Sequence, residues 1–243
     1  MCIRDRRFLD WNIYARLERL FIKLFLQEED LHVSILLDAS RSMDWGSPAK
    51  GLYAKRVAAA LAYIGLCNYD RISVYAWRDD LAEQITSLRG RSMMHRLIDF
   101  LQKLPLDGPS NMTRACRSFA VRHPQPGVLV MLSDLLDKGG FETGLRYLLR
   151  RDLDIYLIQI LSPQELQPEL AGDLKLRDIE DGETAEITVS RALLERYRRR
   201  LHAYCDRLRS FCTRRGLNYL FATTDLPFDQ LVLTYLRRKG LLR

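Results

Sequence analysis

The chain has 243 residues, of which 47% are hydrophobic and 28% are charged. This composition supplies enough apolar material for a core of domain size and excludes a chain that is disordered throughout. The formal net charge is +7. Residues 190–216 account for this excess, because they contain nine arginines and only two acidic residues.

The first half of the chain alternates predicted strands and helices. Strands are predicted over residues 19–27, 31–37 and 71–77, and helices over residues 50–67, 93–104 and 113–121. Apolar residues at helical spacing indicate the helix over 50–67, and the alternation of Ile72, Val74 and Ala76 indicates the strand over 71–77. A loop over residues 106–111, rich in Gly, Pro, Asp and Ser, separates the last two helices.

The second half continues this alternation around an inserted hairpin. Strands are predicted over residues 128–132, 153–161 and 217–222, and helices over residues 142–151, 191–215 and 227–239. The wholly apolar run at 128–132 is typical of a central parallel strand that is covered on both faces. Residues 173–189 are predicted to form a hairpin that turns at Asp181 and Gly182. The whole pattern predicts an α/β fold with a doubly wound, mostly parallel sheet flanked by helices.

We expect two parts in the chain: an N-terminal segment with an edge strand over residues 1–30, and one α/β domain over residues 31–243. The longest apolar stretch, residues 57–67, has eleven residues, fewer than the ~20 that span a bilayer. The opening MCIRDRRFLD lacks the apolar core of a signal peptide. We therefore expect no transmembrane segment and a cytoplasmic location.

The cysteines and histidines show no pattern of a metal or disulfide site. Five cysteines form no CxxC pair, which argues against a disulfide framework and against a zinc ribbon. Cys205 and Cys212 lie seven residues apart on a predicted helix and are predicted to pack in the core. The four histidines are scattered without ligand spacing, so none is predicted to bind metal or to act as a base.

Oxygen-bearing side chains follow the apolar strands, at the edge where such sheets bind ligands. The three loops concerned carry Asp38, Ser40 and Ser42, then Ser110 and Thr113, then Ser133 and Asp134. Hard divalent cations, magnesium above all, prefer oxygen ligands of this kind. Alternate positions of an extended loop point the same way, so the D-x-S-x-S spacing lets Asp38, Ser40 and Ser42 converge on one ion.

The same residue types also cap helices and form turns. For Asp38 and Ser42 taken alone, that structural interpretation remains open. Asp44, just beyond the loop, is expected to be solvated, and Arg41 is expected to be exposed, with contact to an acidic partner as the alternative.

The segments LLLDASRSM, NYDRISVYAW and VLVMLSD resemble the metal-ion-dependent adhesion site of the von Willebrand factor type A fold. Together with LDWNIYARLERLFIKLF upstream, and with GDLKLRDIEDGE and RRGLNYL downstream, they resemble the bacterial family known as domain of unknown function 58. The resemblance covers nearly the whole chain after about residue 8. Because that family usually begins before the LDW segment, we expect the N-terminus to be truncated.

The resemblance implies a site for one divalent ion, Mg²⁺ or Mn²⁺. The implied metal ligands are Asp38, Ser40, Ser42, Ser110 and Asp134. The two serines of the first loop would bind directly and Asp38 through water. Ser110 stands where the family pattern has a threonine, so Thr113 is kept as an alternative; Asp137 is the alternative to Asp134.

The resemblance further implies a module without enzymatic activity, which binds an acidic side chain of a partner protein through the ion. A MoxR-type AAA+ ATPase is the implied partner. Two alternatives stay open: a metal-dependent phosphate-ester hydrolase using Asp38 or Asp134, and a nucleic-acid binder acting through residues 191–215. The loops lack a nucleophile–base pair, which argues against the first alternative. The basic segment is not accompanied by an aromatic platform for stacking bases, and the chain shows no known nucleic-acid-binding fold, so we expect no specific nucleic acid.

Overall fold

The structure, a computed structural model, describes residues 31–123, 125–170, 172–177 and 184–236. The chain divides into two compact units, residues 1–30 and 31–243, and all described residues belong to the second unit. The strand predicted over residues 19–27 lies outside the described residues.

The described part of the chain contains one main sheet of six strands, in the order β3-β2-β1-β4-β5-β8. The strands are β1 (His32–Asp38), β2 (Arg71–Trp77), β3 (Leu81–Leu88), β4 (Gly127–Ser133), β5 (Leu153–Leu161) and β8 (Asn218–Thr223). Neighbouring strands are parallel except β2 and β3, which are antiparallel. Because β2 and β4 lie on opposite sides of β1, the topological switch point lies between β1 and β4.

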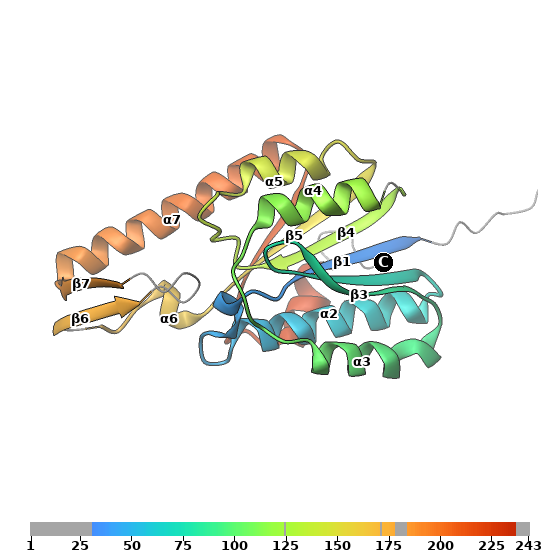
Figure 1. Ribbon diagram of the computed structural model, residues 1–243, viewed down its shortest axis with the longest axis horizontal. Coiled ribbons are helices and arrows are strands. Elements are labelled where there is room, and N and C mark those ends of the chain that lie inside the picture. Colours follow the sequence, from blue (N-terminus) through green and yellow to red (C-terminus); the bar gives the residue numbers. More distant parts are fainter. Residues whose placement is uncertain (1–30, 124, 171, 178–183, 237–243) are drawn as a thin grey trace, which may run out of the picture. The chain divides into compact units, whose positions relative to one another are not determined.

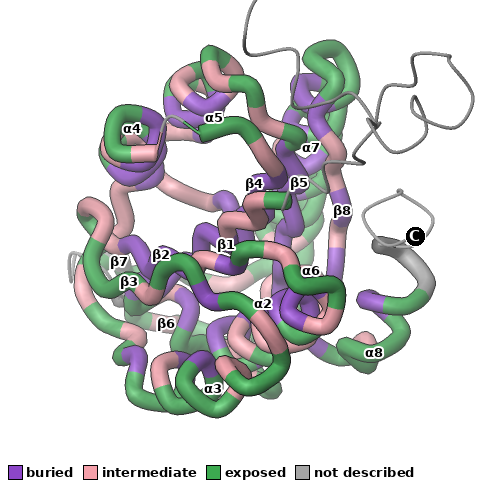
Figure 2. Tube along the Cα trace, turned by 90° about the vertical axis from the view of Figure 1, so that its right-hand side faces the viewer, coloured by how far each residue is buried: buried purple, intermediate pink, exposed green. Residues whose placement is uncertain are grey.

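Helices cover both faces of this sheet (Figures 1 and 2). The helices of the described residues are α2 (Lys50–Cys67), α3 (Met94–Lys103), α4 (Met112–Arg122), α5 (Glu142–Leu148), α6 (Pro163–Leu166), α7 (Arg191–Arg214) and α8 (Phe228–Gln230), with the 3-10 helices η2 (Arg41–Asp44) and η3 (Arg91–Met93) and the π-helix η4 (Leu231–Leu236). In Figure 1, α2 and α3 lie on one face, and α4, α5 and α7 lie on the other. The predicted α/β class is therefore confirmed, and the arrangement is consistent with a von Willebrand factor type A-like or Rossmann-type sheet.

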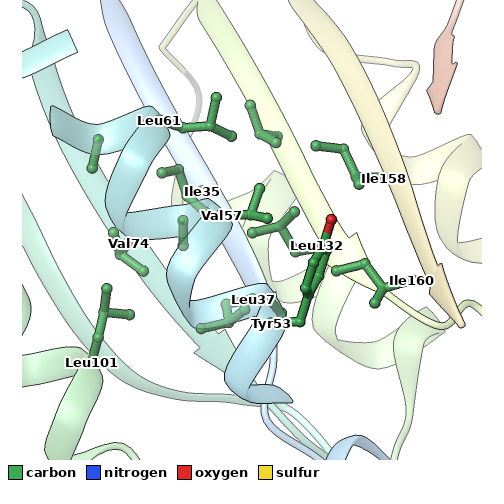
Figure 3. Packing of buried hydrophobic residues seen from close by; sticks show 14 of the residues in the cluster. Ile35, Leu37, Tyr53, Val57, Leu61, Val74, Leu101, Leu132, Ile158 and Ile160 are labelled. Atoms are coloured by element: carbon green, nitrogen blue, oxygen red, sulfur yellow. The ribbon is translucent and has the colours of Figure 1, made fainter. Parts of the chain in front are cut away.

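Each face of the sheet has its own apolar core, because successive strand residues point to opposite sides. Ile35 and Leu37 of β1 pack in the cluster beneath α2 and α3, whereas Leu36 packs in the cluster beneath α4, α5 and α7. Figure 3 shows Val57 of α2 beside Leu132 of β4 in the first cluster. Figure 2 shows the central strands as the buried layer between the helices. This burial explains why β1 and β4 read as nearly continuous apolar runs.

The predicted hairpin is confirmed as a separate two-stranded antiparallel sheet. It consists of β6 (Gly172–Arg177) and β7 (Thr184–Val189), which pair from Gly172 opposite Val189 to Arg177 opposite Thr184. The predicted turn at Asp181 and Gly182 lies outside the described residues.

Several predicted boundaries shift, and the strand β3, the helix α6 and the 3-10 helices η2 and η3 were not predicted. The helix α5 ends at Leu148 rather than at residue 151, and the helix predicted from residue 227 is a short α8 followed by η4. The strand β3 was missed because it is an edge strand with mostly exposed side chains, so its sequence lacks a buried alternation. The short helix α6 was also missed. Within the described residues, every helix is too short or too polar to span a bilayer.

Candidate functional site

Asp38 and Ser133 meet at the topological switch point, where β1 and β4 end side by side. The side chain of Asp38 is almost wholly buried, with 1% exposed. Its Oδ2 atom accepts a hydrogen bond of 2.7 Å from Ser133 Oγ. Its Oδ1 atom accepts bonds from Ser40 Oγ at 2.7 Å and from the Ser40 backbone amide at 3.0 Å. The carboxylate is thus held rigidly between the first and third loops.

Burial makes the charged form of Asp38 unfavourable. Desolvation raises the pKa of Asp38 to about 7, and the nearby negative charge of Asp134 acts in the same direction. The hydrogen bonds from Ser133 and Ser40 lower this pKa but do not offset the rise. A positive charge placed beside Asp38 would therefore relieve a strongly unfavourable electrostatic environment.

The first loop brings two serine hydroxyls together. Ser40 is fully buried, and Ser42, in the first turn of η2, is half-buried. Their Oγ atoms lie 3.1 Å apart. Neighbouring ligands in an octahedral magnesium shell are separated by about 2.9 Å, given Mg–O distances of about 2.0–2.1 Å. The two hydroxyls therefore have nearly the spacing of adjacent ligands to one small divalent ion. Arg41 and Asp44, on either side of Ser42, are exposed.

The second loop is bound to the first through the backbone. The amide of Asp107 donates to the carbonyl of Ala39 at 3.0 Å, and the amide of Arg41 donates to the carbonyl of Gly108 at 2.9 Å. Ser110 follows two residues later and is half-buried. Thr113, its alternative, lies in the first turn of α4 and is also half-buried. The structure thus brings the second loop beside the first, and both hydroxyls remain candidates.

The third loop carries Asp134, whose side chain is nearly buried, with 5% exposed. Its Oδ1 atom accepts a hydrogen bond of 3.1 Å from the amide of Leu136. Its backbone carbonyl accepts a bond of 2.9 Å from the buried Gln159. Asp137, the alternative to Asp134, accepts bonds from the amides of Met112 at 2.7 Å and Gly139 at 2.6 Å. Asp137 therefore anchors α4 to the third loop.

A lysine that the sequence analysis did not single out completes the cluster. Lys50, the first residue of α2, has 1% of its surface exposed. Its Nζ atom lies 2.6 Å from Asp134 Oδ2 and 2.6 Å from Glu165 Oε1. Burial alone would lower the pKa of Lys50, but attraction to Asp134 and Glu165 outweighs burial and raises it. Lys50 therefore remains an ammonium ion inside the protein.

Glu165 is fixed in turn by the start of α6. The Ser162 side chain accepts a hydrogen bond from the Glu165 amide, and Glu165 Oε2 accepts one of 2.8 Å from the Ser162 amide, which completes a capping box. The sequence Ser-Pro-Gln-Glu is a signal from which α6 could have been predicted. Lys50 had no comparable signal, because lysines are almost always exposed.

The charges of this cluster do not balance. When all groups are ionised, Asp38, Asp134 and Glu165 contribute three negative charges and Lys50 contributes one positive charge, which leaves −2. Among the described residues, no group of three or more His, Cys, Asp or Glu side chains is arranged to hold a metal. An ion bound here would therefore depend on the serine hydroxyls as well as on the carboxylates.

The helix α7 contacts both α6 and the third loop through two tyrosines. Tyr197 donates a hydrogen bond of 2.9 Å to the backbone carbonyl of Glu165, and Tyr204, two turns later, donates one of 2.5 Å to that of Leu135. Leu135 has a φ of 57°, a left-handed conformation that non-glycine residues rarely adopt. Cys205 and Cys212 are free and buried on the inner face of α7, so their predicted packing role is confirmed.

Comparisons with known proteins agree with this fold. The uncharacterized proteins Rv1480 of Mycobacterium tuberculosis and Mb1516 of Mycobacterium bovis are both 24% identical to this chain over 206 residues. These matches cover 82% of this chain and 64% of each relative, so the chain spans less than two thirds of the length of these curated relatives. The crystal structure of the conserved hypothetical protein BatB from Bacteroides thetaiotaomicron has a TM-score of 0.53, with 15% identity, and the match covers 87% of this chain and 99% of that chain.

The family comparison agrees with the resemblance seen in the sequence. Residues 4–221 match the family described as "Protein of unknown function DUF58". This match includes the three loops at the switch point, together with α6, α7 and the hairpin. The chain therefore belongs to the DUF58 family.

Proposed function

We propose that this protein is a divalent-metal-dependent protein-binding module without enzymatic activity. The observation that carries the proposal is the 3.1 Å separation of the Ser40 and Ser42 hydroxyls beside the buried Asp38. The proposed ligand set is Asp38, Ser40, Ser42, Ser110 and Asp134, with Mg²⁺ or Mn²⁺ as the ion. The resemblance of the first and third loops to a von Willebrand factor type A adhesion site supports the same assignment.

The residues present fit a divalent cation. The donors are hydroxyl and carboxylate oxygens, which suit Mg²⁺ and Mn²⁺, and the buried cluster has an uncompensated charge of −2 when ionised. When bound, such an ion would supply an open coordination position to a carboxylate of another protein. Ser40 and Ser42 are neutral, so they would leave most of the ion's charge available for that carboxylate.

A MoxR-type AAA+ ATPase that offers an acidic side chain is the partner we propose. This part of the proposal rests on the resemblance to the family in sequence. Because such a partner depends on cellular ATP, the proposal includes a cytoplasmic location.

The contacts of the two carboxylates favour binding over hydrolysis. Asp38 accepts three hydrogen bonds from Ser40 and Ser133, and Asp134 is paired with Lys50. A carboxylate held in this way is a poor nucleophile, because attack would require breaking these interactions first. We expect phosphatase, esterase and nuclease screens with Mg²⁺ or Mn²⁺ to stay at background. Turnover that is abolished by Asp134→Asn would favour the hydrolase instead.

Calorimetric titration with Mg²⁺ and Mn²⁺ tests the metal site. We expect one site in the wild-type chain and its loss in Asp38→Ala. Asp44→Ala is the matched control, because Asp44 is an exposed aspartate in the adjoining helix η2. Binding that is undiminished in Asp38→Ala would contradict the assignment.

Co-elution with a candidate AAA+ ATPase tests the partner. We expect a complex in Mg²⁺ that is lost in chelator and in the double variant Ser40→Ala/Ser42→Ala. Replacing the contacting acidic residue of the ATPase by its amide should have the same effect. A complex that survives both treatments at full affinity would place the docking surface elsewhere, and the hairpin β6–β7 would be the next surface to test.

A further inference from the structure

Lys50 brings a buried ammonium group into direct contact with a proposed metal ligand. Its Nζ atom lies 2.6 Å from Asp134 Oδ2, and the other oxygen of Asp134 accepts the amide of Leu136. Both oxygens of Asp134 are therefore already engaged. A divalent cation that binds Asp134 would have to approach a carboxylate that is already paired with the Lys50 ammonium. The divalent cation and the ammonium group would then repel each other.

Glu165 offers Lys50 a second carboxylate at the same distance of 2.6 Å. This carboxylate is held by the capping box of α6, and Tyr197 of α7 bonds the backbone carbonyl of the same residue. Lys50 therefore has a fixed anionic partner that is independent of Asp134. It can release Asp134 without becoming an unpaired buried charge, which would be strongly unfavourable.

We propose that Lys50 is a built-in competitor of the divalent cation for Asp134, and that Glu165 retains Lys50 when the cation is bound. This inference rests on the proposed function, because it concerns the same site. The balance between the Lys50–Asp134 and Lys50–Glu165 pairs then sets the affinity for the ion. Lys50 acts as a positioning residue and does not itself bind the ion.

Opposite effects of two substitutions on ion affinity test the inference. Lys50→Met removes the charge while keeping a long unbranched side chain, and we expect it to tighten Mn²⁺ binding in calorimetry by at least about tenfold. Glu165→Gln removes one of the two carboxylates paired with Lys50, so Lys50 should pair more strongly with Asp134. We expect this substitution to weaken Mn²⁺ binding by about tenfold. Lys103→Met is the matched control, because Lys103 is exposed in an i,i+4 pair with Asp99.

The double variant Lys50→Met/Glu165→Gln separates competition from a direct effect of Glu165. If Glu165 acts through Lys50, adding Glu165→Gln to Lys50→Met should change the affinity by less than about twofold. A tenfold loss that persists without Lys50 would show that Glu165 itself acts on the ion. That result would overturn the inference, as would an unchanged affinity in Lys50→Met.

Thermal unfolding provides a readout that does not depend on titrating a site. Without Lys50, the carboxylates of Asp134 and Glu165 lack their cation, so the stability of Lys50→Met should depend on Mn²⁺ more strongly than that of the wild type. If Lys50→Met does not fold even with Mn²⁺, the Mn²⁺ affinity of Glu165→Gln is the deciding measurement. An affinity equal to that of the wild type would then overturn the inference.

The outcomes also distinguish this inference from the proposed function. If the wild type binds no ion while Lys50→Met does, Lys50 blocks the site, so the inference stands and the proposed function of the wild-type chain fails. If neither protein binds an ion, both fail. If the wild type binds an ion and neither substitution changes its affinity, the inference alone fails.

Discussion

The ammonium nitrogen of Lys50 and the Oδ2 atom of Asp134 lie 2.6 Å apart in a nearly dry interior, although 84 residues separate them in the sequence. The contact joins the start of α2 to the end of β4, and the second bond of Lys50, to Glu165, adds α6. One side chain thus connects three elements around the switch point. Its removal should therefore affect the stability of the domain as well as the chemistry of the site.

We expect Lys50→Ala to lower the free energy of unfolding by roughly 3–5 kcal/mol in chelator, because it leaves buried carboxylates without a cation. Lys103→Ala, which breaks an exposed pair with Asp99, should cost less than about 0.5 kcal/mol. Urea denaturation of both variants measures the difference. Equal, small losses would show that the buried pair contributes no more than a surface pair.

The buried Asp38 predicts a specific pH dependence of stability. Its pKa is raised from 3.8 to about 7 in the folded chain, so between these values the folded chain binds more protons than the unfolded chain. The free energy of unfolding should therefore fall as the pH rises from about 4 to about 7 and should not change further above that range on account of this group.

Asp38→Asn removes the charge and hence this slope. The free energy of unfolding of the variant minus that of the wild type should therefore increase by up to about 4 kcal/mol from pH 4 to pH 8. This is the order of magnitude that the raised pKa of Asp38 implies. Urea denaturation at several pH values in chelator measures this difference. A difference between the two proteins that is constant across the range would contradict the prediction.

Ser40 and Ser42 should separate stability from ion binding. Ser40 is fully buried and donates to Asp38, so Ser40→Ala should lower the free energy of unfolding by about 1–3 kcal/mol, because it removes a bond to a charged group. Ser42 is half-buried, and Ser42→Ala should change stability by less than about 0.5 kcal/mol. Both variants should bind Mg²⁺ more weakly. Unfolding and calorimetry on the same samples compare the two effects, and wild-type ion affinity in both variants would exclude the serines as ligands.

The basic helix α7 should bind nucleic acid only weakly. Its first ten residues carry five exposed arginines, and such a surface retains nucleic acid through release of counterions. We expect sequence-independent retention at low salt that disappears near ~150 mM and weakens further in Arg196→Gln/Arg199→Gln/Arg200→Gln. Fluorescence anisotropy with duplex and single-stranded oligonucleotides measures this. Nanomolar binding at ~150 mM salt would instead favour the nucleic-acid alternative.

The sequence predicted the fold well where burial leaves a strong pattern. The limits of α2 and β2 agree with the prediction to the residue. In β2 the alternating Ile72, Val74 and Ala76 are all buried, whereas α2 is apolar on most sides and also exposes Leu52 and Tyr63. Asp38 and Asp134 could be placed at the same end of the sheet because each directly follows a predicted apolar strand, and parallel strands end together there.

The sequence did not predict what depends on long-range contacts between polar residues. Lys50 and Glu165 are 115 residues apart, and neither lies in a pattern that distinguishes a buried ion pair from two solvated charges. The strand β3 was missed for a related reason, because an edge strand with one neighbour tolerates polar residues on both faces.

The distance in sequence between Lys50 and its partners also has a consequence for synthesis on the ribosome. At about 5–20 residues per second, the 84 residues between Lys50 and Asp134 take about 4–17 s to emerge. During that time β1, α2 and β2 have been synthesised, but the carboxylates of Asp134 and Glu165 have not. The ammonium group of Lys50 therefore has no anionic partner with which it could be buried. We therefore expect the start of α2 to stay hydrated, and the N-terminal half of the sheet to remain incompletely packed, until β4 and α6 have been synthesised.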